Sequence, residues 1–303
     1  QRSNNEQRTT TPMRSALLTA LSAITILSVQ AQYGTFDPKA IATAKTTTTL
    51  IVLDAGDSPY NRTIQEAVKA HWKFTKSFDF ITVNDLATAP LMPEKTYLLK
   101  TKKTDAEKHD GYFLTLVQGW KQKKGEVINV ENNAVTNLPP AQELAFLMID
   151  PATVSGTGAP MLNVYVKCMQ DYLKQVESGK IKDKATADRL YESRNRFIKD
   201  MDLWVAKEHM DKSIPDATKV KETYSKQLQL MSANQNYAAA YKGEPGVAIS
   251  DIVMTGEYKT KWCFRRVFNA STGELMYQRD EAALYGKKEG FIADDLRILE
   301  QSR

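Results

Sequence analysis

The feature that most constrains the fold is a pattern that occurs twice. Residues from about 50 to 150 and from about 202 to 300 pass through the same order of apolar runs, polar turns and helical stretches. Each half opens with a short apolar run of the length typical of a buried strand, at residues 50–53 and 203–206. Five elements in the same order indicate a duplicated domain.

Each opening run leads into a predicted helix and then a second strand. In the first half Ile64, Val68 and Trp72 recur every four residues, so they share one helix face that Ser58 or Asn61 can cap. In the second half Asp216 can cap a shorter helix. The second strands are expected at residues 78–83 and 227–231. Strand, helix, strand is a βαβ unit, which predicts parallel neighbours.

The later part of each half adds four further elements. Short polar or Ala-rich segments, with room for a short helix, precede the third strands. A hairpin whose turn closes on Gly-Glu follows, and then a final helix. The short polar or Ala-rich segments are expected at 84–89 and 234–242, and the third strands at 96–100 and 247–253. The hairpins are expected at 112–117 with 126–130 and at 262–268 with 274–277. The final helices are expected at 139–148 and 291–300.

The residues between the halves differ in composition. Residues 151–160 are small and rich in Gly and Pro, which indicates a linker. An amphipathic helix is predicted from Tyr165 to Val176, and a second, charged helix at about residues 182–200. The predicted fold class is α/β, with two tandem duplicated βαβ(α)βββα domains with mixed sheets at 32–150 and 201–303. A linker and helical connector at 151–200 joins them.

The start of the chain predicts export. Met13 and Arg14 begin a short positive region, residues 16–29 are apolar but too short to span a bilayer, and cleavage is expected after Ala31. Residues 1–12 resemble upstream read-through. We therefore expect a cleavable signal peptide, no transmembrane segment in the mature chain, and a periplasmic or extracellular location.

Charge does not favour nucleic acid. Removing residues 1–31 takes away three arginines and one glutamate, so the formal net charge falls from +5 to +3. Basic clusters at residues 100–103, 121–124 and 265–266 are more typical of solvated and buried strand faces than of a polyanion site. We expect no nucleic-acid partner.

The two cysteines, Cys168 and Cys263, leave two alternatives open. An oxidising compartment permits a disulfide between them. Each also lies in an apolar pattern, where a free cysteine packs as a small hydrophobic side chain. No C-x-x-C pair is present, and the three scattered histidines have no ligand spacing, so we expect neither a redox site, nor a metal site, nor a cofactor.

Candidate catalytic residues are few. Asp54 and Asp57 follow the first strand of the first half and His209 follows that of the second. The carboxyl ends of strands are where α/β folds place functional groups. The loop after residue 53 is also what a strand-to-helix turn needs, and it lacks the second aspartate, two residues on, of phosphotransferase sites.

A resemblance supports export and fold. The Val-Gln-Ala-Gln leader end, the Asp-rich loop and residues 60–68 before Trp72 are similar to exported proteins of Bacteroidota without an assigned activity. The topology resembles the amino-terminal α/β module of periplasmic TolB. The resemblance implies compartment and fold, and not an activity.

Two functions of different class remain. The first is a non-enzymatic envelope protein that binds a protein partner or a cell-wall component through its duplicated modules. The second is a hydrolase or transferase with a cleft site after the first strand of each half, at Asp54, Asp57 and His209. A second half kept only for oligomer contacts is a third reading.

Overall fold

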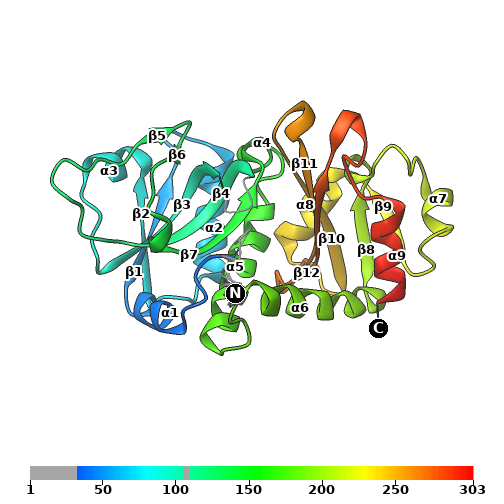
Figure 1. Ribbon diagram of the computed structural model, residues 1–303, viewed down its shortest axis with the longest axis horizontal. Helices are drawn as coiled ribbons and strands as arrows, with labels where there is room; N and C mark the ends of the chain where they lie inside the picture. The colour runs from blue at the N-terminus through cyan, green and yellow to red at the C-terminus, as the bar shows by residue number, and fades with distance from the viewer. Residues whose placement is uncertain (1–32, 105–108, 303) are drawn as a thin grey trace, which may run out of the picture.

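The computed structural model describes residues 33–104 and 109–302. This part of the chain is a mixed α/β protein with two mixed sheets (Figure 1). The predicted signal peptide at residues 1–31 lies outside the described residues. Among the helices of the described part, none is long and apolar enough to cross a membrane.

The first sheet has seven strands, and five of them follow the order β2-β1-β3-β4-β7. β1 is parallel to β2 and β3, and the later neighbours are antiparallel. The short strands β5 and β6 pair with each other, and β6 joins β3. The bounds are β1 Thr48–Leu53, β2 Ser77–Thr82, β3 Lys95–Thr104, β4 Asp110–Gln118, β5 Val130–Glu131, β6 Ala134–Val135 and β7 Glu143–Ile149.

The second sheet has five strands in the order β9-β8-β10-β11-β12. β8 is parallel to β9 and β10, and β11 is antiparallel to β10 and β12. The order and the directions therefore match those of the five-strand path in the first sheet. The bounds are β8 Asp202–Ala206, β9 Leu228–Met231, β10 Val247–Thr255, β11 Trp262–Asn269 and β12 Leu275–Ala282.

The beginnings of both halves agree with the predicted strand, helix, strand order. Ser58 is the N-cap of the first long helix and accepts a hydrogen bond from the Asn61 amide at 3.1 Å, while Asp216 caps the shorter helix in the second half. The helices of the halves are α1 Pro38–Lys45, α2 Pro59–His71, α3 Val83–Thr88, α7 Ala217–Lys221, α8 Ala233–Lys242 and α9 Ala293–Gln301. The predicted final helix of the second half is confirmed as α9.

The predicted final helix of the first half, at residues 139–148, is wrong. The segment forms one turn of 3-10 helix, η1 (Pro140–Gln142), and then β7, which is buried along its whole length. A strand buried on both faces shows a continuous apolar run, and periodicity alone does not distinguish it from a buried helix. Two further contacts bury β7. Gly34 and Thr35 run along its outer edge, and the second sheet packs against its end.

The predicted hairpin between residues 112–117 and 126–130 is also wrong. β4 pairs instead with β3 and β7, and residues 119–129 form a loop over the sheet. Ile128 in that loop is buried against one sheet face, whereas its neighbour Val127 is exposed. The corresponding hairpin in the second half, between β11 and β12, is confirmed.

The segment between the sheets is mostly helical. It contains α4 (Pro151–Ser155), α5 (Met161–Glu177), α6 (Lys184–Arg194) and the 3-10 helix η2 (Asn195–Asp200). The predicted linker at 151–160 thus begins with a helical turn, because the Asp150 side chain caps the amides of Ala152 and Thr153. The predicted charged helix at 182–200 divides into α6 and η2.

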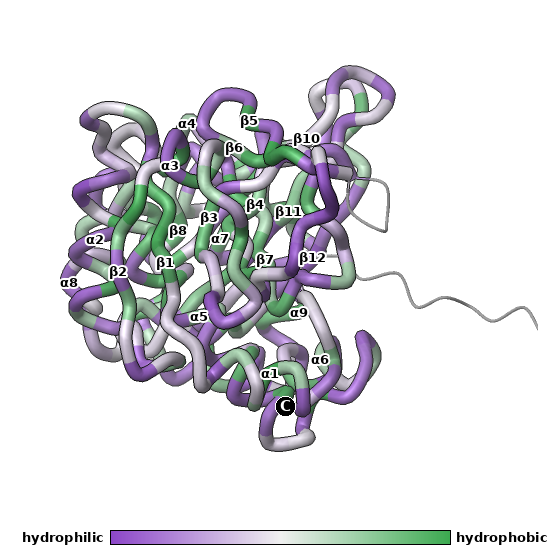
Figure 2. The backbone as a smooth tube through the Cα atoms, turned by 90° about the vertical axis from the view of Figure 1, so that its left-hand side faces the viewer, coloured by the Kyte–Doolittle hydropathy of each residue, from purple (hydrophilic) through white to green (hydrophobic). Residues whose placement is uncertain are grey.

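The sheets and helices form layers around α5, which lies between the two sheets in Figure 1. The largest core cluster joins α5 to residues of both sheets, from Ile51 and Leu147 in the first to Ile249 and Leu275 in the second. The outer face of each sheet has a separate core, beneath α3 in the first half and beneath α7 and α9 in the second. Figure 2 shows apolar strands inside a more hydrophilic outer surface. We call the two sheets, each with its outer helices, the first and second lobes.

Candidate functional site

Asp54, the first predicted site residue, is used in a buried ion pair. Its carboxylate lies 2.5 Å from the Lys100 ammonium on β3, and both side chains are about 5% exposed. The same ammonium lies over the Tyr60 ring, 4.3 Å from its centroid. Burial, and then the Asp54 charge, raise the pKa of the Tyr60 hydroxyl well above its usual value. Asp54 therefore faces the interior.

The loop after β1 is closed by its own polar groups. The Asp54 amide donates to the Asn61 side chain at 2.7 Å, and the Asn61 amide group donates back to the carbonyl oxygens of Asp54 and Gly56. The Ala55 amide donates to Asn133, in the turn between β5 and β6, at 3.0 Å. The loop thus has the bonds of a structural turn.

Asp57 lies on the surface. Its carboxylate is 2.6 Å from Arg62 on α2, and both side chains are more than half exposed. An exposed pair of this kind is worth about 0–1 kcal/mol.

His209 is part of a neutral cluster in the second lobe. Its Nδ1 lies 2.8 Å from the Ser250 hydroxyl on β10. That hydroxyl accepts hydrogen bonds from the Ala206 amide at 3.0 Å and the Asn236 side chain at 2.9 Å. Because a hydroxyl has two lone pairs and one proton, Ser250 donates to His209 and fixes the proton of the imidazole on Nε2. Burial lowers the pKa of His209, which agrees with a neutral ring.

The three predicted residues do not converge. Asp54 follows β1 of the first sheet, His209 ends the 3-10 turn η3 (Lys207–His209) after β8 of the second, and Asp57 is on the surface. None of them lines any of five prominent cavities in the described part of the chain.

Both cysteines are free and buried, so the disulfide that the sequence permitted is not formed. Cys168 packs in the core around α5, and Cys263 lies mid-strand in β11. Burial raises the pKa of each thiol to about 12, so both are protonated at neutral pH. A protonated, buried thiol is unreactive.

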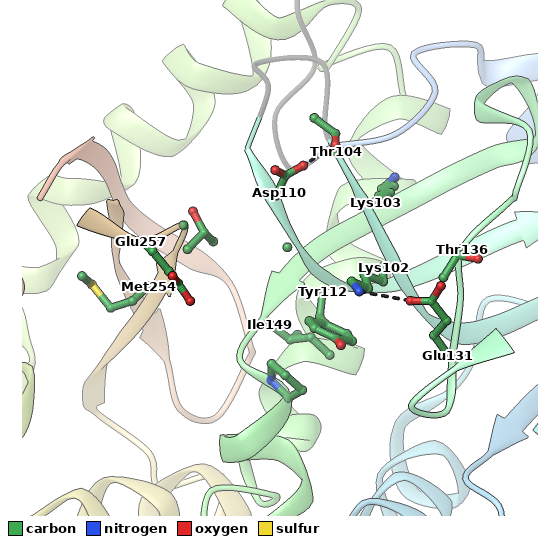
Figure 3. A pocket seen from close by; sticks show the side chains of 14 residues that line it. Lys102, Lys103, Thr104, Asp110, Tyr112, Glu131, Thr136, Ile149, Met254 and Glu257 are labelled. Atoms are coloured by element: carbon green, nitrogen blue, oxygen red, sulfur yellow. Dashed lines mark hydrogen bonds and ion pairs between the residues drawn. The ribbon is translucent and has the colours of Figure 1, made fainter. Parts of the chain in front are cut away.

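A cavity of about 810 Å³, the largest of five in the described part of the chain that we compared, lies between the lobes. We call it the cleft. Its first wall comes from the end of β3 and the start of β4, with Glu131 of β5 and Thr136 after β6, and its second wall from the end of β10 (Figure 3). The lining residues are Lys102, Lys103, Thr104, Asp110, Gly111, Tyr112, Glu131, Thr136, Ile149, Pro151, Met254, Thr255, Gly256 and Glu257.

The first wall is polar, and its lysines are paired with carboxylates. Lys102 lies 3.1 Å from Glu131, a contact visible in Figure 3, and the bond raises the pKa of the Lys102 ammonium. Lys103 pairs with the buried Glu143 at 2.5 Å. Together with Lys100, each lysine of the basic cluster at residues 100–103 therefore has a carboxylate partner.

The second wall carries one unpaired charge. Glu257 is exposed, and its carboxylate makes no ion pair within residues 33–104 and 109–302. Figure 3 shows Glu257 and Met254 across the cleft from Tyr112 and Lys102. The Tyr112 ring with Ile149 and Pro151 supplies the apolar part of the lining. The cleft therefore offers apolar surface with hydrogen-bonding groups at its rim, which suits a polar ligand of low net charge.

Buried contacts beneath the cleft hold its two walls together. Arg266 on β11 is fully buried, binds Asp251 at 2.5 Å, and donates to the carbonyl oxygen of Met148 on β7 at 2.8 Å. Asp251 also accepts from the Tyr165 hydroxyl on α5 at 2.9 Å. Since these bonds join both sheets and the helix between them, the geometry of the cleft is fixed by buried groups.

Among the described residues, no group of three or more His, Cys, Asp or Glu side chains could hold a metal ion. The cleft lysines that could stabilise a developing negative charge are already paired with carboxylates.

Sequence reasoning missed most of the cleft. The basic cluster at residues 100–103 was visible, but Glu131 and Glu143 are distant in sequence from the lysines that they pair with. Glu257 sits in a polar turn with no sequence signal beyond its composition. Only the antiparallel register of β3 and β4 brings Lys102 opposite Tyr112.

Comparisons with known proteins add no relative: no protein-family model matches the chain, and neither the curated proteins nor the solved structures give a match.

Proposed function

We propose that this is an exported, non-enzymatic protein of the cell envelope that binds a cell-wall component in the cleft between its two α/β lobes. The observation that carries the proposal is the cleft itself, an opening of about 810 Å³ with paired lysines, the exposed Glu257 carboxylate and apolar surface. It works in the periplasm or outside the cell, where such components are exposed.

The size of the cleft supports a small or narrow ligand. Binding sites for small molecules are commonly concave with volumes of roughly 300–1,000 Å³. A protein partner held in a stable complex instead buries roughly 800 Å² on each side, usually across a flatter patch. The proposal therefore prefers a wall component to the protein partner that the sequence also allowed.

The geometry disfavours the hydrolase or transferase alternative. A catalytic carboxylate or imidazole must reach the substrate. Asp54 and His209 are tied to Lys100 and Ser250, and Asp57 lies outside the cleft.

We also propose that the two lobes arose by duplication and that the helices between them act as the connector. The matching order and directions of the two five-strand paths support the duplication. The burial of α5 against both sheets supports the connector role.

Binding to the cell wall tests the function. The mature protein should sediment with insoluble, purified wall sacculi in a saturable way. Lys102→Glu places a second carboxylate beside Glu131, so we expect it to weaken binding at least about 10-fold. Lys124→Glu, in the exposed loop outside the cleft, makes the same charge change and should bind normally.

Two results would contradict the proposal. If the protein shows no saturable binding to sacculi, its ligand is not a cell-wall component, even if a protein partner is captured from envelope extract. If Lys102→Glu and the native protein bind equally well, the cleft is not the binding site.

Export is tested separately. After cell fractionation, the amino-terminal sequence of the envelope form should begin at Gln32 if cleavage follows Ala31. An unprocessed protein in the cytoplasm would contradict the signal-peptide proposal.

A further inference from the structure

Two tyrosines project from adjacent loops of the second lobe. Tyr258 lies in the 3-10 turn η4 (Tyr258–Thr260), after β10, and Tyr285 in η5 (Leu284–Gly286), after β12. Their side chains are 86% and 78% exposed, the two largest values among the exposed large hydrophobic residues of the described chain. We call these two loops the tip.

Both tyrosines have a left-handed backbone. Their φ angles are 47° and 56°. Positive φ is unusual for a bulky side chain, because Cβ crowds the backbone. Such strain persists only where the surrounding structure imposes it, and it is concentrated at binding and catalytic sites. Here its effect is to hold two aromatic rings out in solvent.

The two rings border one cavity of about 380 Å³. An ion pair between Lys261 and Glu289 forms another part of its lining. Gly256 and Glu257 line this tip cavity and also the cleft. The two openings therefore adjoin, with the unpaired Glu257 carboxylate where they meet.

We propose that the tip is a second subsite for a linear saccharide chain, which runs from the cleft past Glu257 to Tyr258 and Tyr285. This inference rests on the proposed function, and it names the ligand class of the same site. The chain contacts the cleft with one part of its length and the tyrosine rings with another.

The chemistry of the surface fits sugars. A pyranose ring has apolar C–H faces and hydroxyl edges. The exposed faces of the two rings offer rigid apolar area, and the phenol hydroxyls add hydrogen bonds. The Glu257 carboxylate accepts hydrogen bonds from hydroxyl groups, and charge-assisted bonds of this kind are strong.

An extended peptide is the alternative occupant, and the test below separates it from a saccharide. Peptides in extended form usually bind by adding a strand to a free sheet edge. Among the described residues, Lys102 and Lys103 at the cleft pair only with β4, and Met254 and Thr255 pair only with β11.

The test is calorimetry with soluble linear oligomers of N-acetylglucosamine, from two to eight units. For the native protein, affinity should increase with length once the oligomer reaches both openings. In the double variant Tyr258→Gly and Tyr285→Gly, affinity for the longest oligomer should fall at least about 10-fold, while the shortest binds as before. Glycine accepts positive φ without strain, so these changes preserve the loop conformation.

Matched variants isolate the rings. Tyr241→Ala removes an exposed tyrosine on α8 that lines neither cavity, and it should leave all affinities unchanged. Tyr258→Phe and Tyr285→Phe retain the ring faces and should keep most of the gain with length.

The outcomes separate the tip from the cleft. If long and short oligomers bind the native protein equally, the tip subsite is wrong and the cleft remains. If only long oligomers bind and the tyrosines are required, the tip remains and the cleft proposal fails. If no oligomer binds, or a linear peptide binds in its place, the saccharide inference is overturned.

Discussion

At the same end of their sheets, the two lobes are stabilised by different kinds of buried polar interaction. In the first lobe the ends of β1 and β3 hold the buried Asp54–Lys100 ion pair, and the β5–β6 turn covers the loop after β1 through Asn133. In the second lobe the corresponding ends of β8 and β10 hold the neutral cluster around Ser250, with Asn236 and His209.

The comparison shows how one strand order can be stabilised in two ways. A buried ion pair is costly to form, and it becomes strongly destabilising when one partner is lost. A neutral cluster distributes smaller energies over several hydrogen bonds. The first lobe should therefore be more sensitive than the second to a single change at its strand ends.

The largest effect is expected for Asp54→Ala. It leaves the Lys100 ammonium buried without its partner, which costs about 3–5 kcal/mol of unfolding free energy. Urea unfolding measures the change. Asp57→Ala, which breaks only an exposed pair, should cost about 0–1 kcal/mol. A small and equal effect for both variants would show that the Asp54 pair contributes little.

Next in size is Leu173→Ala on α5, which tests whether the lobes unfold separately. Leu173 is fully buried in the core that joins both sheets. Its truncation should cost about 2–5 kcal/mol. The unfolding transition measured by circular dichroism should coincide with the transition measured by tryptophan fluorescence from each lobe. Variants that keep only Trp72 or only Trp204 report on the first and the second lobe. Two separated transitions would show that the lobes are independent.

Ser250→Ala tests the neutral cluster. Without the hydroxyl, the Ala206 amide and the Asn236 side chain lose an acceptor while buried, so we expect a cost of about 1–3 kcal/mol. The exposed Ser193→Ala serves as the control and should stay within about 0.5 kcal/mol. If Ser250→Ala costs as much as Asp54→Ala, the contrast between the lobes disappears.

The smallest effect is a pH dependence from His209. Burial lowers its folded pKa below the usual value of about 6.5, although the charges of Asp251 and Glu208 act in the opposite direction. A histidine with a lowered pKa contributes stability above about pH 6.5, and this stability is lost as pH falls through the folded pKa.

The native protein should therefore lose more stability between pH 7.5 and 5.5 than His209→Gln, by less than about 1.4 kcal/mol per pH unit. Unfolding curves at both pH values measure the difference. Parallel losses in the two proteins would show that His209 is not the group that titrates.

Local patterns predicted the elements that local chemistry decides. The Ser58 cap, the Ile64–Val68–Trp72 face and the parallel β1–β2 pair depend on residues close in sequence. The segment that became β7 was assigned to a helix because its burial depends on the second lobe, which its own residues do not encode.

The candidate site was harder to predict for the same reason. Asp54 stands where a catalytic carboxylate would, and only the three-dimensional contact with Lys100 shows that its charge is used internally. The cleft needs the start of β4 and the end of β10 to face each other, and those strands are far apart in the chain.

The position of α5 in the chain affects how the protein reaches its native state. Its apolar surface packs on Ile64 of the first lobe and also on Phe268 and Leu275, near the end of the chain. A polypeptide that emerges with its amino terminus first therefore presents a half-covered helix until β11 and β12 arrive. Exposed apolar surface in such intermediates promotes aggregation, so we expect this helix to be the most aggregation-prone part of the chain until its synthesis is complete.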